Sequence, residues 1–120
     1  MVPGHPDDPD DALRAVMRAL AVSAREANLA RTAVLEEALA ALETGPLTPE
    51  QRAAAASAAH QVVGSAGTFG RRRSSELAAG LEQWFTDGSS EVADAASRSR
   101  VRAQVAALRA DLTEDQRDEV

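Results

Sequence analysis

The sequence has no cysteine and no tyrosine, and aromatic residues make up only 2 % of its 120 positions. The absence of cysteine excludes disulfides, cysteine-based zinc sites and thiol chemistry, and it fits a reducing cytoplasm. Much of the apolar content is alanine, which buries little area. A core must therefore come from close packing around scattered leucine, valine and methionine side chains, Trp84 and the two phenylalanines.

Long apolar runs and nucleotide-binding loops are also missing. No stretch approaches the roughly 18 apolar residues that a membrane span needs, and the first residues lack the basic start and apolar core of a signal peptide. No Gly-x-x-x-x-Gly-Lys loop is present to hold nucleotide phosphates. We therefore expect a cytoplasmic chain without a membrane contact, a bound metal or the ATP-binding module of a kinase.

Positive charge is scarce, because 13 basic residues face 19 acidic ones and the formal net charge is −6. An acidic chain is a poor candidate for binding nucleic acid phosphates. The one basic cluster, Arg71-Arg72-Arg73, has no interleaved aromatic residues. The sequence therefore predicts a protein that binds no nucleic acid.

Helix breakers are confined to a few places, and no proline follows Pro49. Three of the five prolines fall within residues 1–9, which read as a disordered acidic leader. Residues 10–113 show apolar positions at helical spacing without strand-like alternation, and residues 114–120 form a charged tail. We predict an all-α domain, an antiparallel four-helix bundle with an additional N-terminal helical segment.

The helix boundaries follow from local signals. An unbroken helix from Leu13 to Leu42 would be much longer than the later ones, so we predict a break near residues 23–28, with the first part lying across the end of the bundle. Thr48-Pro49-Glu50-Gln51 forms a capping box that starts the second helix. A third helix is expected over about 71–86. Ser89 or Ser90 is expected to cap the last, whose inner stripe would begin at Val92.

His60 is one of only two histidines and lies about three turns into the second helix. At roughly 100° per residue, Ala55, Ala58, Val62, Ala66 and Phe69 line the opposite, buried side. The helical neighbours of His60 are all small: Ala53, Ala56, Ser57, Gly64 and Gly67. A glycine inside a helix costs about 1 kcal/mol relative to alanine. The pattern therefore indicates a face kept bare so that a partner can approach the imidazole.

The same residues carry a resemblance to a known family. His60 is followed by Val62 and Val63, then Gly64, the small pair Ser65-Ala66 and Gly70, and the next helix contains Leu81-Glu82. This arrangement resembles the histidine-containing phosphotransfer (HPt) domain of bacterial multistep phosphorelays. The specific motif covers only the stretch from His60 to Glu82, and the helical pattern extends the likeness to most of the chain. Val63 departs from it, since many members carry a lysine there beside the phosphoryl group.

The resemblance implies a phosphocarrier rather than an enzyme with turnover. His60 would accept a phosphoryl group from the aspartyl phosphate of one response-regulator receiver domain and pass it to another. The implied partners are receivers and a hybrid or cognate histidine kinase, with no cofactor on this chain, which we expect to be a monomer. A neutral imidazole is a nucleophile suited to this role.

Two groups of residues would surround the phosphoacceptor. Gln61 and Gly64 are the expected phosphoryl surroundings. The expected docking surface for a partner consists of Ala53, Ala56, Ser57, Gly67, Arg71, Arg72 and Arg73. A cationic cluster at a helix start is not favoured by the helix dipole, which is compatible with a docking role or with an ordinary solvated turn.

A different class of function stays open. The bundle could bind a receiver or another helical partner as a scaffold or inhibitor without being phosphorylated, and His60 would then be an ordinary surface residue. Incubation with a phosphorylated receiver separates the two hypotheses, because only a phosphocarrier takes up an acid-labile, base-stable label.

Overall fold

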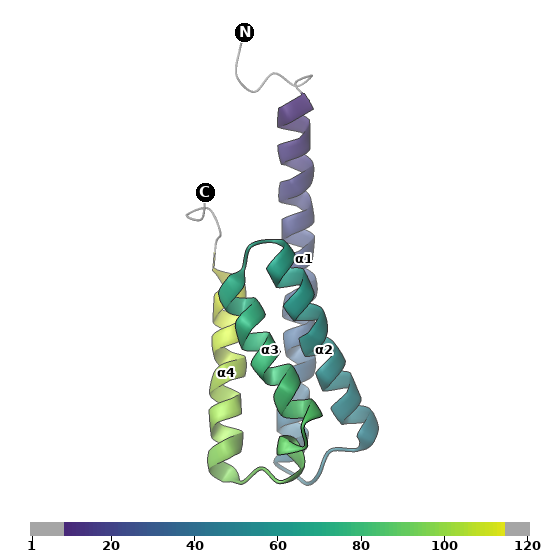
Figure 1. The fold of residues 1–120 in the computed structure, drawn as a ribbon, viewed down its shortest axis with the longest axis vertical. Coiled ribbons are helices and arrows are strands. Elements are labelled where there is room, and N and C mark those ends of the chain that lie inside the picture. Colours follow the sequence, from purple (N-terminus) through teal and green to yellow (C-terminus); the bar gives the residue numbers. More distant parts are fainter. Residues whose placement is uncertain (1–8, 115–120) are drawn as a thin grey trace.

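The computed structural model describes residues 9–114, and these residues form four α-helices and one short 3-10 turn. The helices are α1 (Pro9–Leu42), α2 (Pro49–Thr68), α3 (Arg72–Thr86) and α4 (Ala95–Thr113), and the 3-10 turn is η1 (Ser89–Glu91). Successive helices run in opposite directions (Figure 1). The predicted all-α antiparallel four-helix bundle is therefore confirmed.

The core contains small aliphatic side chains from all four helices. Leu35, Leu81, Leu108 and Leu112 are fully buried, and alanines fill the space between them on α2 and α3. Because alanine keeps the helix axes close, a chain with very few aromatic residues can still exclude water from its centre. Trp84 lies at the edge of this core, with its ring packed edge-on against Phe85 at a centroid distance of 5.0 Å.

The start of α2 is the boundary that the sequence predicts most accurately. The Gln51 backbone N–H donates to Thr48 Oγ1 at 3.0 Å, and the Thr48 N–H donates to Gln51 Oε1 at 2.8 Å. Pro49 occupies the first helical position. This reciprocal capping box satisfies two backbone donors and fixes the register of the helix that carries His60.

The prediction for the start of the last helix is wrong. Ser89 begins η1 instead, and α4 starts at Ala95 with Asp94 as its cap, whose Oδ1 accepts from the Ser97 N–H at 2.8 Å. Val92, predicted as the first residue of the inner stripe, is 84 % exposed. The stripe is buried only from Val101 onward. Val92 lies in the connection between η1 and α4 at the lower end of the bundle (Figure 1), and the first residues of α4 are exposed as well.

The predicted break in the first helix is also wrong, since α1 is one continuous helix of 34 residues. Residues 10–42 contain neither glycine nor proline and are rich in alanine, so nothing in the chain opposes helix at residues 23–28. Asp10 and Asp11 lie within its first turn, where acidic side chains are favoured by the helix dipole. The predicted leader falls outside the described residues except for Pro9, and the predicted tail except for Glu114.

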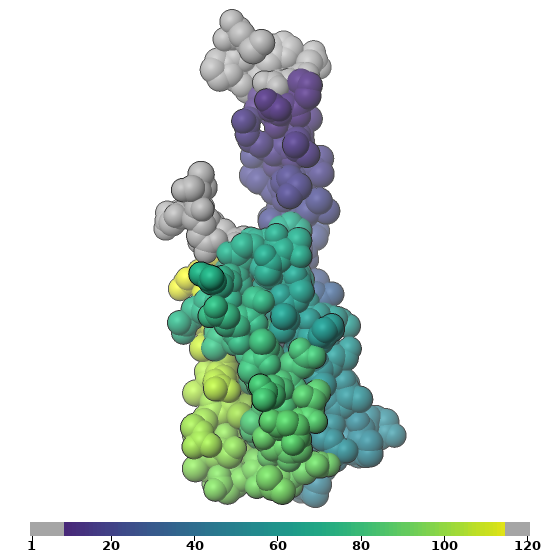
Figure 2. Space-filling view, in the orientation of Figure 1, coloured from purple at the N-terminus to yellow at the C-terminus, as the bar shows by residue number. Residues whose placement is uncertain are grey.

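The N-terminal part of α1 does not lie across the bundle but extends beyond it (Figures 1 and 2). The described molecule measures 63 × 25 × 20 Å as a result. We call residues 9–23 the projecting segment and residues 24–42 the bundle segment of α1. None of the helices in residues 9–114 is long and apolar enough to cross a membrane.

Candidate functional site

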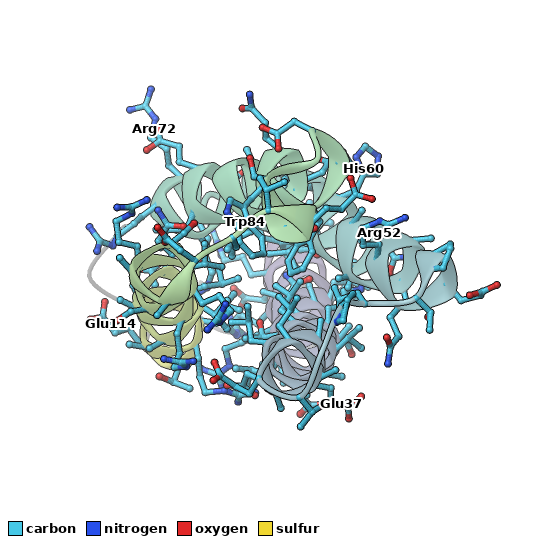
Figure 3. All side chains as sticks on the ribbon, turned by 90° about the horizontal axis from the view of Figure 1, so that it is seen from below. Glu37, Arg52, His60, Arg72, Trp84 and Glu114 are labelled. Atoms are coloured by element: carbon cyan, nitrogen blue, oxygen red, sulfur yellow. The ribbon has the colours of Figure 1, made fainter. Side chains whose placement is uncertain are left out.

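His60 lies in the middle of α2, on the side of that helix next to α3 (Figure 3). Its side chain is 74 % exposed. Ala55, Ala58, Val62 and Ala66, on the opposite side of α2, are buried in the core. The imidazole therefore stands on a rigid element with its reactive edge open to solvent.

The imidazole has a polar contact with a residue of α3. His60 Nδ1 lies 3.0 Å from Glu82 Oε2, and the Glu82 side chain is 32 % exposed. An ionised carboxylate can only accept hydrogen bonds. In the neutral imidazole that makes this contact, Nδ1 therefore carries the hydrogen and Nε2 carries the free lone pair.

The face around His60 is as bare as the sequence predicts. Ala53, Ser57, Gln61, Gly64 and Gly67 are all exposed, and Ala56 is partly buried against the core. The Gln61 amide donates to Ser57 Oγ at 3.3 Å, one turn back along the same helix. This hydrogen bond holds the Gln61 side chain along α2. The other side chains of this face are too small to shield the His60 ring from a partner.

The two glycines of α2 differ in their surroundings. A Cβ built at Gly64 would meet nothing within 4 Å, whereas one at Gly67 would lie 3.5 Å from Ser75 Oγ. Gly64 therefore leaves open space beside the imidazole, and Gly67 lies close to α3. The Ser75 hydroxyl donates to the Val63 carbonyl oxygen at 2.8 Å, which holds α3 against α2 at this level.

Val63, the residue that departs from the resemblance described above, is partly buried and packs against the core. A valine here adds to the contact between helices and supplies no charge. The acidic Glu82, which lies across from α2, is the charged group in direct contact with the imidazole.

The arginine cluster divides into one structural residue and two exposed ones. Arg71 is only 7 % exposed, and its guanidinium donates to the Asp111 carbonyl oxygen at 2.6 Å and to the Glu114 carbonyl oxygen. It thus adds a second donor to the Asp111 carbonyl, which also accepts from the Glu114 N–H at 3.2 Å, and gives the Glu114 carbonyl just past α4 a partner. Arg71 does not lie on a docking surface, and that part of the expectation is wrong.

Arg72 and Arg73 remain exposed. The Arg72 side chain is 90 % exposed, with Glu76 at 3.6 Å as its ionic partner. Both residues begin α3, at the end of the bundle where α2 stops. They remain candidates for contact with an acidic partner.

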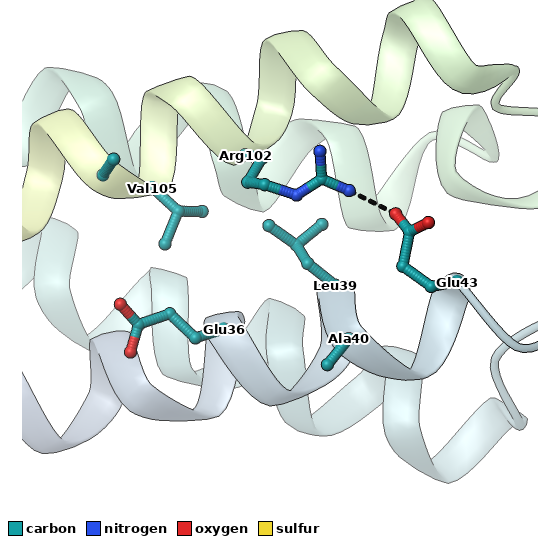
Figure 4. A pocket seen from close by; sticks show the side chains of 7 residues that line it. Glu36, Leu39, Ala40, Glu43, Arg102 and Val105 are labelled. Atoms are coloured by element: carbon teal, nitrogen blue, oxygen red, sulfur yellow. Dashed lines mark hydrogen bonds and ion pairs between the residues drawn. The ribbon is translucent and has the colours of Figure 1, made fainter.

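A hollow of the described surface lies elsewhere, between α1 and α4 (Figure 4). It measures about 300 Å³, with Leu39 and Val105 among its lining residues. Its charged lining residues are already paired, Arg102 with Glu43 and Glu36 with Arg109, which lies outside the hollow. It offers no free group for chemistry and contains no histidine.

Glu82 is the functional candidate that sequence reasoning missed. It enters the resemblance only as part of the pair Leu81-Glu82, and it is 22 residues from His60 in the chain. Helical periodicity relates residues within one helix and cannot show that a carboxylate of the next helix reaches the ring. The signal that could have found it is its place one residue after the buried Leu81, which directs it to the edge of α3.

Comparison with known proteins gives one result. No curated protein and no solved structure gives a significant match to the chain. The Hpt domain family matches residues 24–111, which is most of the chain and coincides with the bundle from the bundle segment of α1 to the end of α4. Domains of this family act as phosphocarriers in phosphorelays. The chain therefore belongs to the Hpt domain family.

Proposed function

We propose that the chain is a cytoplasmic phosphorelay intermediate that carries the phosphoryl group on Nε2 of His60. The observation that supports this most directly is the contact of Nδ1 with Glu82 at 3.0 Å, on a ring that is otherwise open to solvent. Nδ1 is hydrogen-bonded to Glu82, and Nε2 is accessible to a partner. Gln61 and Gly64 would lie beside the phosphoryl group.

The transfer step is balanced by the partner's carboxyl group. The lone pair of His60 Nε2 attacks the phosphorus of an aspartyl phosphate on a receiver domain. An N–P bond forms, the P–O bond to the acyl oxygen breaks, and the aspartate leaves as a carboxylate. The ring then carries positive charge, which the Glu82 carboxylate stabilises through the hydrogen bond from Nδ1. The reverse reaction loads a second receiver.

The bare face explains how two receivers could use one histidine in turn. A receiver has to bring its aspartate within bonding distance of Nε2, and small residues allow its active site to come close to the α2 backbone. Ala53, Ala56, Ser57 and Gly67 would form the surface it contacts. Arg72 and Arg73 would steer an acidic receiver and raise its association rate, mainly at low salt.

The test of the phosphoacceptor uses a receiver labelled with ³²P on its aspartate and the two histidines of this chain. We expect the wild-type chain and the His5→Gln control to take up acid-labile, base-stable label. His60→Gln should take up none, with an unchanged melting temperature because the side chain is exposed. Label on His60→Gln would refute the assignment. Binding of the phosphorylated receiver without any label would favour the alternative, a non-phosphorylated scaffold or inhibitor.

The role of Glu82 is tested by two substitutions that differ only in whether an acceptor remains. Glu82→Ala removes a hydrogen bond to a group that becomes charged, and we expect transfer to slow by about tenfold, or 1.4 kcal/mol. Glu82→Gln keeps an acceptor oxygen and should retain the Nδ1–H tautomer in ¹⁵N spectra of His60. If Glu82→Ala left both the rate and the tautomer unchanged, Glu82 would have no positioning role.

Access over the bare face is tested with the two open helical glycines. Gly64→Gln sets a long side chain one turn from His60, and we expect it to slow transfer by at least about tenfold, or 1.4 kcal/mol. The matched control is Gly80→Gln, because a Cβ at Gly80 also meets nothing within 4 Å and Gly80 lies beside Gln104 of α4. Equal rates for the two variants would show that the receiver does not approach over Gly64.

A further inference from the structure

The projecting segment of α1 leaves large apolar side chains uncovered. Leu13, Val16, Met17 and Leu20 are 49–60 % exposed, although they recur at the three- and four-residue spacing of a helix face that packs against another helix. Single exposed leucines are ordinary, but a stripe of four large apolar residues on one isolated helix marks an interaction site.

The stripe faces the same way as the buried face further along α1. Leu13 and Leu35 lie within about 40° of each other around the helix, and Leu35 is fully buried against the bundle. Figure 1 shows that this part of α1 extends past the end of the bundle where α2 stops and α3 begins. The direction of Leu35 therefore places the stripe on the side of the helix that faces the space above that end. A partner that covers the stripe must have about the width of one helix, and it must end before it reaches the bundle.

We infer that this stripe pairs with the same stripe of a second copy of the chain, antiparallel, and forms a symmetric dimer in place of the monomer expected from the sequence. The projecting segment is 15 residues long, or roughly 22 Å. The open space beside this segment ends at the bundle of the first copy. A second projecting segment that runs in the opposite direction fits this space, because it is equally long before its own bundle begins. Its end would then lie above the bundle of the first copy, and the two copies are related by a twofold axis, the commonest symmetry of dimers.

The helix dipoles favour the antiparallel direction, because parallel pairing would place like ends of the two helices side by side. The side-chain charges do not separate along this part of α1: Arg14 and Arg18 follow Asp10 and Asp11, Glu26 follows Arg25, and Asp11 already pairs with Arg14. The direction is therefore not decided by side-chain charge.

The shape of the molecule also excludes the parallel direction. Paired helices lie 8–10 Å apart, whereas the described molecule is 20–25 Å across its two shorter axes. A parallel partner helix on the stripe would run down into the bundle of the first copy. An antiparallel partner has its own bundle at the opposite end, where nothing obstructs it.

A lipid surface fits the stripe less well than a second copy. Residues 9–26 hold three acidic residues and three arginines, so this part of the helix has no net charge to attract it to anionic lipids. A contact of this size lies at the small end of specific interfaces, and we expect a dissociation constant of about 10–100 μM.

The first experiment is sedimentation equilibrium of the full chain, from about 5 μM to 1 mM, with two matched variants. Leu20 and Val22 are 49 % and 48 % exposed, yet they point to opposite sides of the helix, and only Leu20 belongs to the stripe. We expect Leu20→Glu to weaken dimerisation at least tenfold and Val22→Glu to change it less than twofold. Circular dichroism should show equal helix content for both variants.

The second experiment tests direction by disulfide cross-linking, which the cysteine-free chain allows. In the antiparallel register, Leu13 of one copy lies opposite Leu20 of the other. A mixture of Leu13→Cys and Leu20→Cys chains should therefore give mainly mixed disulfides. Mainly self-linked chains would show the parallel direction and overturn the proposal.

Three further outcomes would overturn it. The first is a wild-type chain that stays monomeric up to 1 mM, and the second is equal effects of Leu20→Glu and Val22→Glu on dimerisation. The third is a monomeric chain that co-sediments with vesicles of phosphatidylcholine and phosphatidylserine and loses this binding in Leu20→Glu. That result would assign the stripe to a lipid surface instead of a second copy.

Discussion

The two segments of α1 have similar sequences and opposite surroundings. Both place large aliphatic residues at helical spacing, yet Leu35 and Leu39 of the bundle segment are 0 % and 5 % exposed, while Leu13 and Leu20 of the projecting segment are 60 % and 49 % exposed. An apolar stripe therefore predicts a helix with one face that packs against another apolar surface. It does not specify whether the partner of that face is in the same chain.

The comparison also separates local from tertiary sources of helix stability. Most of the projecting segment extends beyond α2, α3 and α4 (Figure 1), so its helix depends mainly on alanine-rich composition and on the Asp11–Arg14 ion pair at 2.9 Å. The bundle segment adds burial and cross-helix polar contacts, such as the hydrogen bond of 3.2 Å from Asn28 Nδ2 to Ser65 Oγ. The two segments should respond differently to the same kind of substitution.

The largest difference is expected for truncation of a leucine. Leu35→Ala removes a fully buried side chain and should lower the free energy of unfolding by about 2–5 kcal/mol. Leu13→Ala removes a side chain that is 60 % exposed and should change it by less than about 0.5 kcal/mol. Urea denaturation at 1–2 μM protein checks this, since association is negligible at about that concentration. A loss for Leu13→Ala as large as that for Leu35→Ala would mean that the projecting segment packs on its own bundle.

A smaller difference is expected for glycine at two exposed alanines. Ala30→Gly in the bundle segment should lower the free energy of global unfolding by about 1 kcal/mol, because the helix there unfolds together with the core. Ala19→Gly should leave global unfolding unchanged and speed amide hydrogen exchange only in residues 9–23. Uniform protection across all of α1 in both variants would contradict the separation into two segments.

The success of sequence reasoning followed the range of the interactions involved. The capping box at Thr48 is determined within one helical turn and was predicted residue by residue. The small residues around His60 also follow from helical spacing, but the spacing does not show that Ala56 is partly buried or that Gly67 lies close to α3. The break in α1 was predicted on the assumption that a helix is no longer than the bundle, although no residue in the chain required it.

The failures at the site have the same origin. Arg71 reads as one of three equivalent arginines, and only the fold shows that its guanidinium reaches the end of α4, 40 residues away. Glu82 reads as one more surface carboxylate until α3 lies beside α2. Both are contacts between helices. The periodicity of one helix does not show which of its residues contact which residues of the next helix.

The smallest expected difference between the two segments of α1 is in how their ion pairs affect stability at acidic pH. Arg109 donates from Nε and Nη2 to the Glu36 carboxylate at 2.7 and 2.8 Å, which joins α4 to the bundle segment of α1. This hydrogen bond from Arg109 holds the pKa of Glu36 below its ordinary value of 4.5. Since the folded pKa is the lower one, the stability it gives is fully present above pH 4.5 and is lost as the pH falls through the folded pKa.

Glu36→Gln should therefore make the free energy of unfolding fall less steeply as the pH drops below 4.5. Its dependence on pH above 4.5 should not change. Both side chains are about 40 % exposed, so solvent screening limits the effect to well under about 1 kcal/mol. Asp11→Asn is the control, because it removes an ion pair of similar length from the projecting segment and should leave the pH dependence of global unfolding unchanged. The measurement is the urea midpoint between about pH 3 and 7. Equal flattening in both variants would show that the projecting segment unfolds together with the bundle, and the two segments of α1 would then be one cooperative unit.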